Sequence, residues 1–580
     1  TSLTSFLLVG FNHADIQARA AACQALLVTM GGGLALLGGL LLLAQMAGSW
    51  TLSGIVAAAP VLTADPRLEL ALTLVLLGAF TKSAQFPFHF WLPNAMSAPT
   101  PVSAYLHSAT MVKLGIYLMA RLDPAFNDLL FWEAMLVGTG TLTAVWAAVL
   151  ALRERDLKRI LARSTVSALG TLTLLIGLPS PGAALAVVAF LFAHALYKAP
   201  LFMVAGNIDH ATGTRNIDHL MGLRRSMPLT ATAAVLAGLS MAGLPLSFGF
   251  VAKDVIAVAK AEAEVLMLVS YATVFVNAIA VAVAGVAAVR VFWGPPEAPR
   301  GQVHEVSWRM FVPPLAIVLL GIEFDFFPAL ADPLLLAAAR SISPQLGVVE
   351  LSAAFDLDAL LSATGITAVI GLLFFFTWDR LHQSLHRLYR LDDRFGPAAW
   401  YEHLLHGLSR VAAWHTRRLQ GGRLSSYLRL TLAALLLMGA FAWWTGDSRA
   451  LVKWDWPPQA WAWAVAALLI VAGATAALLL NDRLAVLMAS GLVGYGSAVW
   501  FLFAGAPDLA FTQFMVETAL VVVAASVLPR YGPAPPRREP WRWTNAALAA
   551  AAGIGTFLLL AHLQGLPPNA ELADWFGRTS

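Results

Sequence analysis

The sequence contains a single cysteine, Cys23, among 580 residues. One thiol cannot form a disulfide framework or hold a four-thiolate iron–sulfur cluster, so neither is expected within this chain. Charged residues are also scarce: they make up 12% of the sequence, against about 25% in soluble domains. Because no basic domain with interleaved aromatic residues occurs, we exclude a nucleic acid as partner.

Motifs for nucleotide- or cofactor-dependent chemistry are missing as well. The chain has no glycine-rich phosphate loop followed by lysine, no metal-ligand spacing, no nucleophile elbow and no haem-attachment motif. We therefore expect no cofactor, no ATP-driven pump and no enzyme.

Apolar sequence is abundant, at 59% of the residues with a mean hydropathy of +0.72. A spanning helix needs about 20 apolar residues, and the sequence offers sixteen candidate segments, the first of them partial, at 1–11. These segments predict an all-α fold, a polytopic transmembrane helical bundle. Since the chain starts with Thr1 inside an apolar run, we also expect a fragment that is truncated at both ends.

Three parts are predicted along the chain: 1–378, a first membrane domain; 379–426, a polar stretch; and 427–580, a second transmembrane module. Residues 380–423 are too polar to span a membrane. Trp400, Leu404, Leu408 and Val411 recur there at helical spacing, which predicts a lateral amphipathic helix. A plain solvated loop is the alternative.

Arginine and lysine collect in loops that fall on one side of the predicted topology. Those loops are 152–163, 207–228, 379–426 and 529–542. Cytoplasmic loops carry the excess of positive charge, so we place them in the cytoplasm and the chain in the cell's inner (plasma) membrane.

Lys82 ends an apolar run, and Pro87 follows five residues later. Proline removes a backbone hydrogen bond and frees the carbonyl of Ser83. In a bilayer, freed backbone groups persist only inside protein or beside water. A charge inside the membrane is expensive and is by default functional. The sequence therefore predicts a broken helix with Lys82 on a proton or ion path, the alternative being a lysine that snorkels to the interface.

His107 and Lys113 lie on the next predicted helix, 100–121. In a regular helix their spacing corresponds to a rotation of about 240°, so they would face different neighbours, as in a relay. Histidine titrates near physiological pH, and burial lets a lysine release its proton in the same range. A structural role for His107 alone is equally compatible with the sequence.

Two further lysines repeat the pattern. His194 and Lys198 are four residues apart on one helical face, and Pro200 follows. In segment 229–262, Gly243 and Pro245 interrupt an apolar helix ahead of Lys253 and Asp254. Discontinuous (proline-broken) helices at mid-membrane are typical of transporters. We thus predict broken helices at Lys82, Lys198 and Lys253.

The C-terminal part offers two carboxylates. Asp508 stands at a predicted helix start, where we expect a structural N-cap. Glu517 lies about 13 Å further along that helix among apolar residues. A carboxylate in such a place favours proton handling, with a structural hydrogen bond as the alternative.

The run TKSAQFPFHFWLPNAMSAPTPVSAYLHSATMVKLGIYLMAR (81–121) resembles the antiporter-like, proton-translocating subunits of respiratory complex I and of Mrp-type cation/proton antiporters. DLKRILARSTVSALG (156–170), HALYKAPLFMVAG (194–206) and GFVAKD (249–254) are similar to the same families. The stretch 482–523 and RRLQGGRLSSYL (417–428) look like the extra module of the A subunits of Mrp-type Na+/H+ antiporters, which favours that family.

The resemblance implies a hetero-oligomeric antiporter that exports Na+ or another monovalent cation against entering protons, with other membrane subunits as partners. It places a hydrophilic axis at mid-membrane, and Lys158 joins the candidates as a weaker member. It also implies an acidic partner for Lys82 in a segment before Thr1. The residues it assigns to that axis and to a second site are Lys82, His107, Lys113, His194, Lys198, Lys253 and Glu517.

Two other functions stay open at this point. The chain could be the proton-pumping membrane subunit of a redox complex, such as complex I or a membrane-bound hydrogenase, with all redox cofactors on partner subunits. It could also be a scaffold whose lysines only lock helices together. The scaffold predicts that removing a lysine changes assembly and leaves ion exchange intact.

Overall fold

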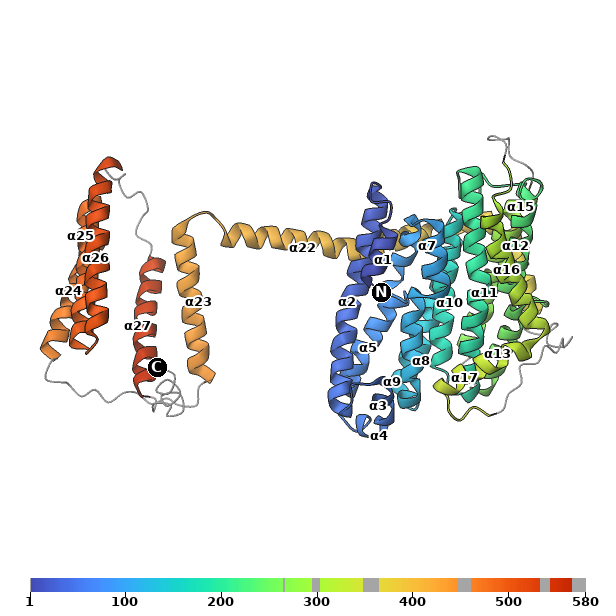
Figure 1. The fold of residues 1–580 in the computed structure, drawn as a ribbon, viewed down its shortest axis with the longest axis horizontal. Coiled ribbons are helices and arrows are strands. Elements are labelled where there is room, and N and C mark those ends of the chain that lie inside the picture. Colours follow the sequence, from blue (N-terminus) through green and yellow to red (C-terminus); the bar gives the residue numbers. More distant parts are fainter. Residues whose placement is uncertain are drawn as a thin grey trace. The chain divides into compact units, whose positions relative to one another are not determined.

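The computed structural model describes residues 2–263, 267–294, 303–347, 365–445, 460–531 and 543–565. Residues 1–406 and 407–580 form two compact units. Helices make up both units, and no β-strand occurs in these ranges (Figure 1). The all-α prediction is confirmed.

The first unit is a bundle in which α2 packs on α5, α5 on α8, α8 on α10, α10 on α11, and α11 on α13 and α16 (Figure 1). Its helices are α1 (Ser2–Val9), α2 (Ile16–Ala47), α3 (Leu52–Ala57), α4 (Ala59–Leu62), α5 (Leu68–Lys82), α6 (Trp91–Asn94), α7 (Thr100–Ala104), α8 (Leu114–Phe126), α9 (Leu130–Ala151), α10 (Leu157–Ile176), α11 (Pro181–Thr212), α12 (Pro228–Ala242), α13 (Phe248–Glu262), α14 (Met267–Gly285), α15 (Val291–Trp293), α16 (Trp308–Phe326), α17 (Asp332–Ile342), α19 (Gly365–Phe376), α20 (Trp378–Ser384) and α21 (His386–Phe395).

Helix α10 lies at the centre of this unit. Nearly all of its residues are buried, because α6, α8, α9, α11 and α14 surround it. Helix α9 approaches it closely at Gly140 and Gly170, where each glycine's missing Cβ leaves room for the other helix's backbone. Polar groups on α10 must therefore find partners within the protein, and Thr165 and Thr173 donate to carbonyls four residues back at 2.9 and 3.0 Å.

The predicted helix break after Lys82 is confirmed. Helix α5 ends at Lys82, and three short pieces follow: η1 (Phe88–Phe90), α6 and η2 (Ala95–Ser97). The break between α12 and α13 at Gly243 is confirmed as well. Nine helices of the described residues are long and apolar enough to cross a membrane, whereas the sequence predicts sixteen segments over the whole chain.

Two helices differ from their predictions. Helix α11 runs unbroken from Pro181 to Thr212 with Pro200 inside it, so the predicted break at Lys198 is wrong. Helices α10, α12, α13 and α16 pack against α11 and support it through the proline. The predicted regular helix 100–121 is wrong too: α7 passes into a π-helical turn, η3 (Tyr105–Ala109), then a 3-10 turn, η4 (Met111–Lys113), before α8. The 240° rotation between His107 and Lys113 therefore does not apply.

The polar stretch after the first membrane region is helical, as the amphipathic pattern predicts. Helices α20 and α21 are followed by α22 (Pro397–Leu419). Its residues Trp400, Leu404, Leu408 and Val411 are 60–72% exposed, so this apolar stripe is largely uncovered in the described residues. Asp379 of α20 pairs with Arg155 at 2.6 Å and Arg290 at 3.1 Å, which ties α20 to the bundle.

The second unit contains α23 (Leu424–Thr445), α24 (Ala460–Leu479), α25 (Arg483–Phe503), α26 (Pro507–Val527) and α27 (Trp543–Gly565). Helices α24, α25 and α26 pack together, and α23 packs on α27. Gly473 lets α24 approach the backbone of Ala489 on α25. The division into 1–378, 379–426 and 427–580 stays a prediction.

Candidate functional site

Lys82 is 5% exposed at the last residue of α5. Its Nζ donates to the hydroxyl of Ser2 on α1. The next residue, Ser83, accepts a 3.1 Å hydrogen bond from the backbone N–H of Ile116 on α8. Lys82 thus sits where a helix end meets the start of a neighbouring helix.

Lys113 is equally buried and ends the irregular turn before α8. Its Nζ donates to the carbonyl of Leu191 on α11 at 3.1 Å. A π turn leaves backbone groups out of regular pairing, and such turns are frequent at functional sites. The irregular geometry brings this ammonium group to α11, three residues before His194.

Lys198 is fully buried at the middle of α11. Its Nζ donates to the hydroxyl of Ser164 on α10 at 2.6 Å and lies 3.5 Å from the carbonyl of Leu161. The sulfur of Met241 on α12 is 3.9 Å away. The ammonium group therefore has polar contacts on two other helices, α10 and α12.

Lys253 connects α12 and α13, the two halves of the second broken helix. From α13 its Nζ donates to the carbonyl of Ala242, the last residue of α12, at 2.6 Å. A positive charge at a helix C-terminus is stabilised by the free carbonyls and the helix dipole. Lys198 contacts Met241 and Lys253 contacts Ala242, the next residue in the chain. The two ammonium groups therefore contact neighbouring residues at the end of α12.

A small cavity of about 40 Å³ lies beside Lys253. Ser164, the partner of Lys198, lines it together with Lys253 itself, and Ser167, Tyr197 and Asn277 add polar groups. A space of about 10–15 Å³ holds one water if it offers polar partners. The cavity is thus large enough for water beside Lys253 and Ser164, the hydrogen-bond partner of Lys198.

His107 and His194 are both fully buried; neither ring nitrogen of His107 has a hydrogen-bond partner in the described part of the chain, whereas His194 lies beside the backbone of Ser108. The charges of Lys113 and Lys198 act on His194, and that of Lys158 acts on His107. Buried polar groups are normally paired, so the unpaired imidazole of His107 differs from that of an ordinary core histidine.

The two weaker candidates of the first unit, Lys158 and Asp254, differ in burial. Lys158 is fully buried at the start of α10 and donates to the carbonyl of Ala98 at 2.7 Å. Asp254 is exposed on α13. Among the described residues, no carboxylate forms an ion pair with a lysine of the row formed by Lys82, Lys113, Lys158, Lys198 and Lys253. The hydrogen-bond partners of these lysines are neutral.

In the second unit, Glu517 is half-buried on α26 against the glycines of α25. A methyl group at Gly494 would overlap its carboxylate, so the glycine makes the room that Glu517 occupies. The prediction that Asp508 is an N-cap is wrong: Ala506 holds that position and Asp508 lies in the first turn. A carboxylate there still complements the helix N-terminus.

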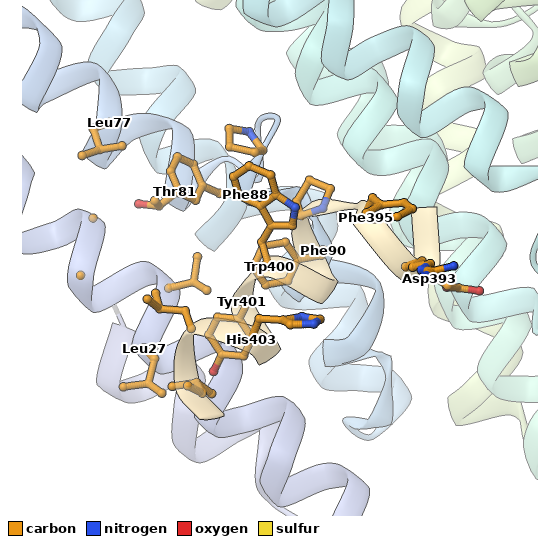
Figure 2. A pocket seen from close by; sticks show the side chains of 18 residues that line it. Leu27, Leu77, Thr81, Phe88, Phe90, Asp393, Phe395, Trp400, Tyr401 and His403 are labelled. Carbon is orange, nitrogen blue, oxygen red and sulfur yellow. The ribbon is translucent and has the colours of Figure 1, made fainter. Parts of the chain in front are cut away.

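The first unit also carries an apolar groove of about 1230 Å³ along α2, α5 and the start of α22. Figure 2 shows Leu27 and Leu77 with Phe88, Trp400 and Tyr401 around it. Thr81 lines the groove, but its hydroxyl donates to the carbonyl of Gly78 at 2.8 Å. The lining is mostly apolar, which suits hydrocarbon, and Asp393, Arg394 and His403 are its charged or titratable members.

Sequence reasoning missed Ser164 and Met241, which contact Lys198. Neither residue is conspicuous locally, because Ser164 follows a basic loop and Met241 lies in an apolar run. Their role emerges only from helices that meet in space.

A polytopic bundle with two interrupted helices and a row of buried lysines defines the class of antiporter-like membrane transport subunits. The family described as "NADH:quinone oxidoreductase/Mrp antiporter, TM" matches residues 1–279. A second family, that of the MBH D subunits, matches residues 468–533.

Two relatives decide the family within this class. The Na+/H+ antiporter A subunit of Bacillus subtilis (strain 168) is 35% identical, with 100% of this chain and 76% of that protein covered. The Na+/H+ antiporter A subunit of Alkalihalophilus pseudofirmus is 34% identical, with 98% and 74% covered. The chain belongs to the family of Na+/H+ antiporter A subunits.

The solved Mrp complex from Dietzia sp. DQ12-45-1b contains a chain that is 32% identical with a TM-score of 0.80, covering 99% of this chain and 62% of that one. A probable K+/H+ antiporter A/B subunit of Rhizobium meliloti (strain 1021) is 36% identical, with 99% and 60% covered. This chain therefore spans about 60% of the length of these two relatives.

Proposed function

We propose that this chain is one subunit in a multi-subunit monovalent cation/proton antiporter. Protons move between Lys82, His107, Lys113, His194, Lys198 and Lys253, and this movement drives the export of Na+ or K+. The names of the relatives, which are Na+/H+ and K+/H+ antiporter subunits, support this reaction. Other membrane subunits complete the complex.

The observation that carries the proposal is the way the lysines are held. Each ammonium group donates to a neutral oxygen on another element: Ser2, Leu191, Ser164 and Ala242. A buried lysine paired with a carboxylate is held in its charged form, whereas one bound to neutral oxygens can lose its proton without leaving a buried anion. Such groups are suited to pass protons.

The basic loops face the cytoplasm in this proposal, and the membrane is the plasma membrane. Arg153, Arg155 and Arg159 lie at the connection from α9 to α10, on the same side as α20 and α21. The proton gradient drives exchange, at about 2.3 kcal/mol per charge per 100 mV.

Lys253→Ala in the intact complex tests the proposal, with exchange measured as Na+- and K+-dependent pH changes in inverted vesicles. We expect the rate to fall at least about tenfold, because a charge-assisted hydrogen bond within the relay is worth about 1.5–3 kcal/mol. Lys260→Ala is the matched control: Lys260 lies two turns along α13 and donates to Thr273 at 3.0 Å, outside the row. Equal exchange in both variants, with the complex assembled, contradicts the relay and favours the scaffold.

A further inference from the structure

A groove of about 730 Å³ lies between α7 with the irregular turn η3, the second half of α11 and the start of α16. Close contacts join these segments. A Cβ at Gly206 of α11 would overlap Thr100 of α7, and Asn207 of α11 donates to the carbonyl of Met310 of α16 at 3.2 Å. The residues that line the groove are separate from the lysine row.

The part of the groove that lies deeper along α11 is apolar. Ala199 and Met203 of α11 line it together with Pro313 of α16. Tyr105 of η3 adds an aromatic side chain that is 60% exposed. From Ala199 to His210 the groove follows α11 for about 16 Å, close to the thickness of one leaflet of the hydrocarbon core, about 15 Å. This part therefore suits an acyl chain.

The other end of the groove holds its charged and titratable residues, which are Asp209, His210 and Arg309. It lies on the side of the basic loops, because α11 ends at Thr212 and runs into loop 207–228 there. Asp209 is 3.7 Å from Arg215, a distance that is too long for a hydrogen bond. The carboxylate of Asp209 can therefore accept hydrogen bonds from a further group.

Arg309 lies in the first turn of α16, where the helix dipole favours an anion and disfavours a cation. That turn contains no acidic residue, and no ion pair among the described residues includes Arg309. The guanidinium carbon lies 5.7 Å from the ring centre of Trp308, and tryptophan is enriched at the level of lipid headgroups. A phosphate group here would neutralise the arginine and complement the helix end.

We propose that the groove binds one phospholipid of the leaflet on the side of the basic loops, with phosphatidylethanolamine as the matching headgroup. Its phosphate accepts from Arg309, its ammonium group donates to Asp209, and one acyl chain lies along Met203 and Pro313. The zwitterionic headgroup complements one cation and one carboxylate, whereas an anionic headgroup would add negative charge beside Asp209. The bound chain covers the outer side of the π turn η3.

Photo-cross-linking of the complete complex in phosphatidylglycerol vesicles tests this site. The probe is phosphatidylethanolamine with a diazirine in one acyl chain, and mass spectrometry of peptides locates the labelled residues. We expect labels on α11 near Met203 and on α16 near Pro313. A phosphatidylcholine probe with the same chain should label both sites at least threefold less, because its trimethylammonium group has no N–H to donate to Asp209.

Three variants refine the experiment. Arg309→Gln should lower the labelling by the phosphatidylethanolamine probe at least fivefold, since the phosphate loses its charged donor. Asp209→Asn should make the two probes label equally. Arg224→Gln is the matched control: Arg224 is exposed in η5 (Leu223–Arg225) and does not line the groove, so its labelling should equal that of the original protein.

The outcomes separate a specific lipid from two other occupants. Absence of labels on α11 and α16 in the unaltered complex overturns the proposal and indicates that another subunit covers the groove. Labelling that is equal for both probes, or unchanged in Arg309→Gln, also overturns it, because lipid that merely surrounds the protein behaves in this way. Labelling does not depend on transport, so none of these results bears on the antiporter, which Lys253→Ala tests.

Discussion

The side chain of Lys253 lies directly over Gly243, the residue that ends α12. Gly243 has a positive φ of 65°, and a Cβ placed there would overlap the aliphatic part of Lys253. The same lysine donates to the carbonyl of Ala242, one residue earlier. The helix break, the glycine and the lysine are therefore one structural unit, in which each depends on the other two.

Gly243→Ala tests this unit. We expect a loss of about 1–2 kcal/mol from the left-handed backbone and a further drop in exchange, because the added methyl displaces Lys253 from Ala242. Gly213→Ala is the matched control, since Gly213 ends α11 with a φ of 69° and has open space around it. Thermal unfolding should fall in both variants, whereas exchange should fall only in Gly243→Ala. The same exchange in both would show that only backbone strain matters.

Ser164→Ala removes the hydroxyl that accepts from Lys198 at 2.6 Å. We expect exchange to fall about tenfold, because a hydrogen bond to a charged group is worth about 1.5–3 kcal/mol. Thr173→Val on the same helix is the control, since its hydroxyl bonds only its own helix at Leu169. Rates of cation-driven pH change in vesicles measure both. An unchanged rate in Ser164→Ala would remove Ser164 from the relay.

Asp379 should make the attachment of α20 dependent on pH. Partial burial alone would raise the pKa of Asp379, but hydrogen bonds from Arg155 and Arg290 outweigh it, so the pKa lies below its usual value of 3.8. The stabilisation is therefore present above that usual value and is lost as the pH falls through the lower, folded-state pKa. Asp379→Asn should lower the melting temperature at pH 7, with the difference from the original protein shrinking toward pH 3.

Asp254→Asn is the control for Asp379, because Asp254 is exposed and forms no ion pair with the described residues. Its melting temperature should match that of the original protein at both pH values. A difference between Asp379→Asn and the original protein that stays constant with pH would contradict the ion-pair explanation.

Glu517→Gln distinguishes proton handling from packing in the second unit. The amide keeps the volume that fills the space at Gly494 and removes the titratable group, so we expect intact assembly with exchange at least fivefold slower. Glu69→Gln, at an exposed position in the first turn of α5, is the control. Full exchange in Glu517→Gln would leave this carboxylate a packing role only.

Local chemistry explains which parts of the fold could be predicted. Pro87 after Lys82 and the pair Gly243 and Pro245 interrupt helices as predicted. The effect of proline and glycine on the backbone is confined to a few residues, so it can be seen in the sequence. Pro200 gives the same local signal, yet α11 continues through it, since neighbours on every side support the helix. The irregular turn at His107 carries no local signal that separates it from a regular apolar helix.

The candidate site could also be predicted only in part: its charged residues could be predicted from the sequence, and their partners could not. Buried lysines and histidines are visible in the sequence because their cost in an apolar segment is high. Their partners are not: Ser164, Leu191 and Ala242 are ordinary residues until other helices bring an ammonium group to them.

The sequence by itself determined that this protein is a helical membrane bundle that buries lysines, because hydropathy and proline act locally along the chain. Only the tertiary structure decided that Lys253 lines one cavity with Ser164, the partner of Lys198, and that neither lysine binds a carboxylate of the described residues. Contacts between helices distant in the chain depend on packing, which no single stretch of sequence encodes.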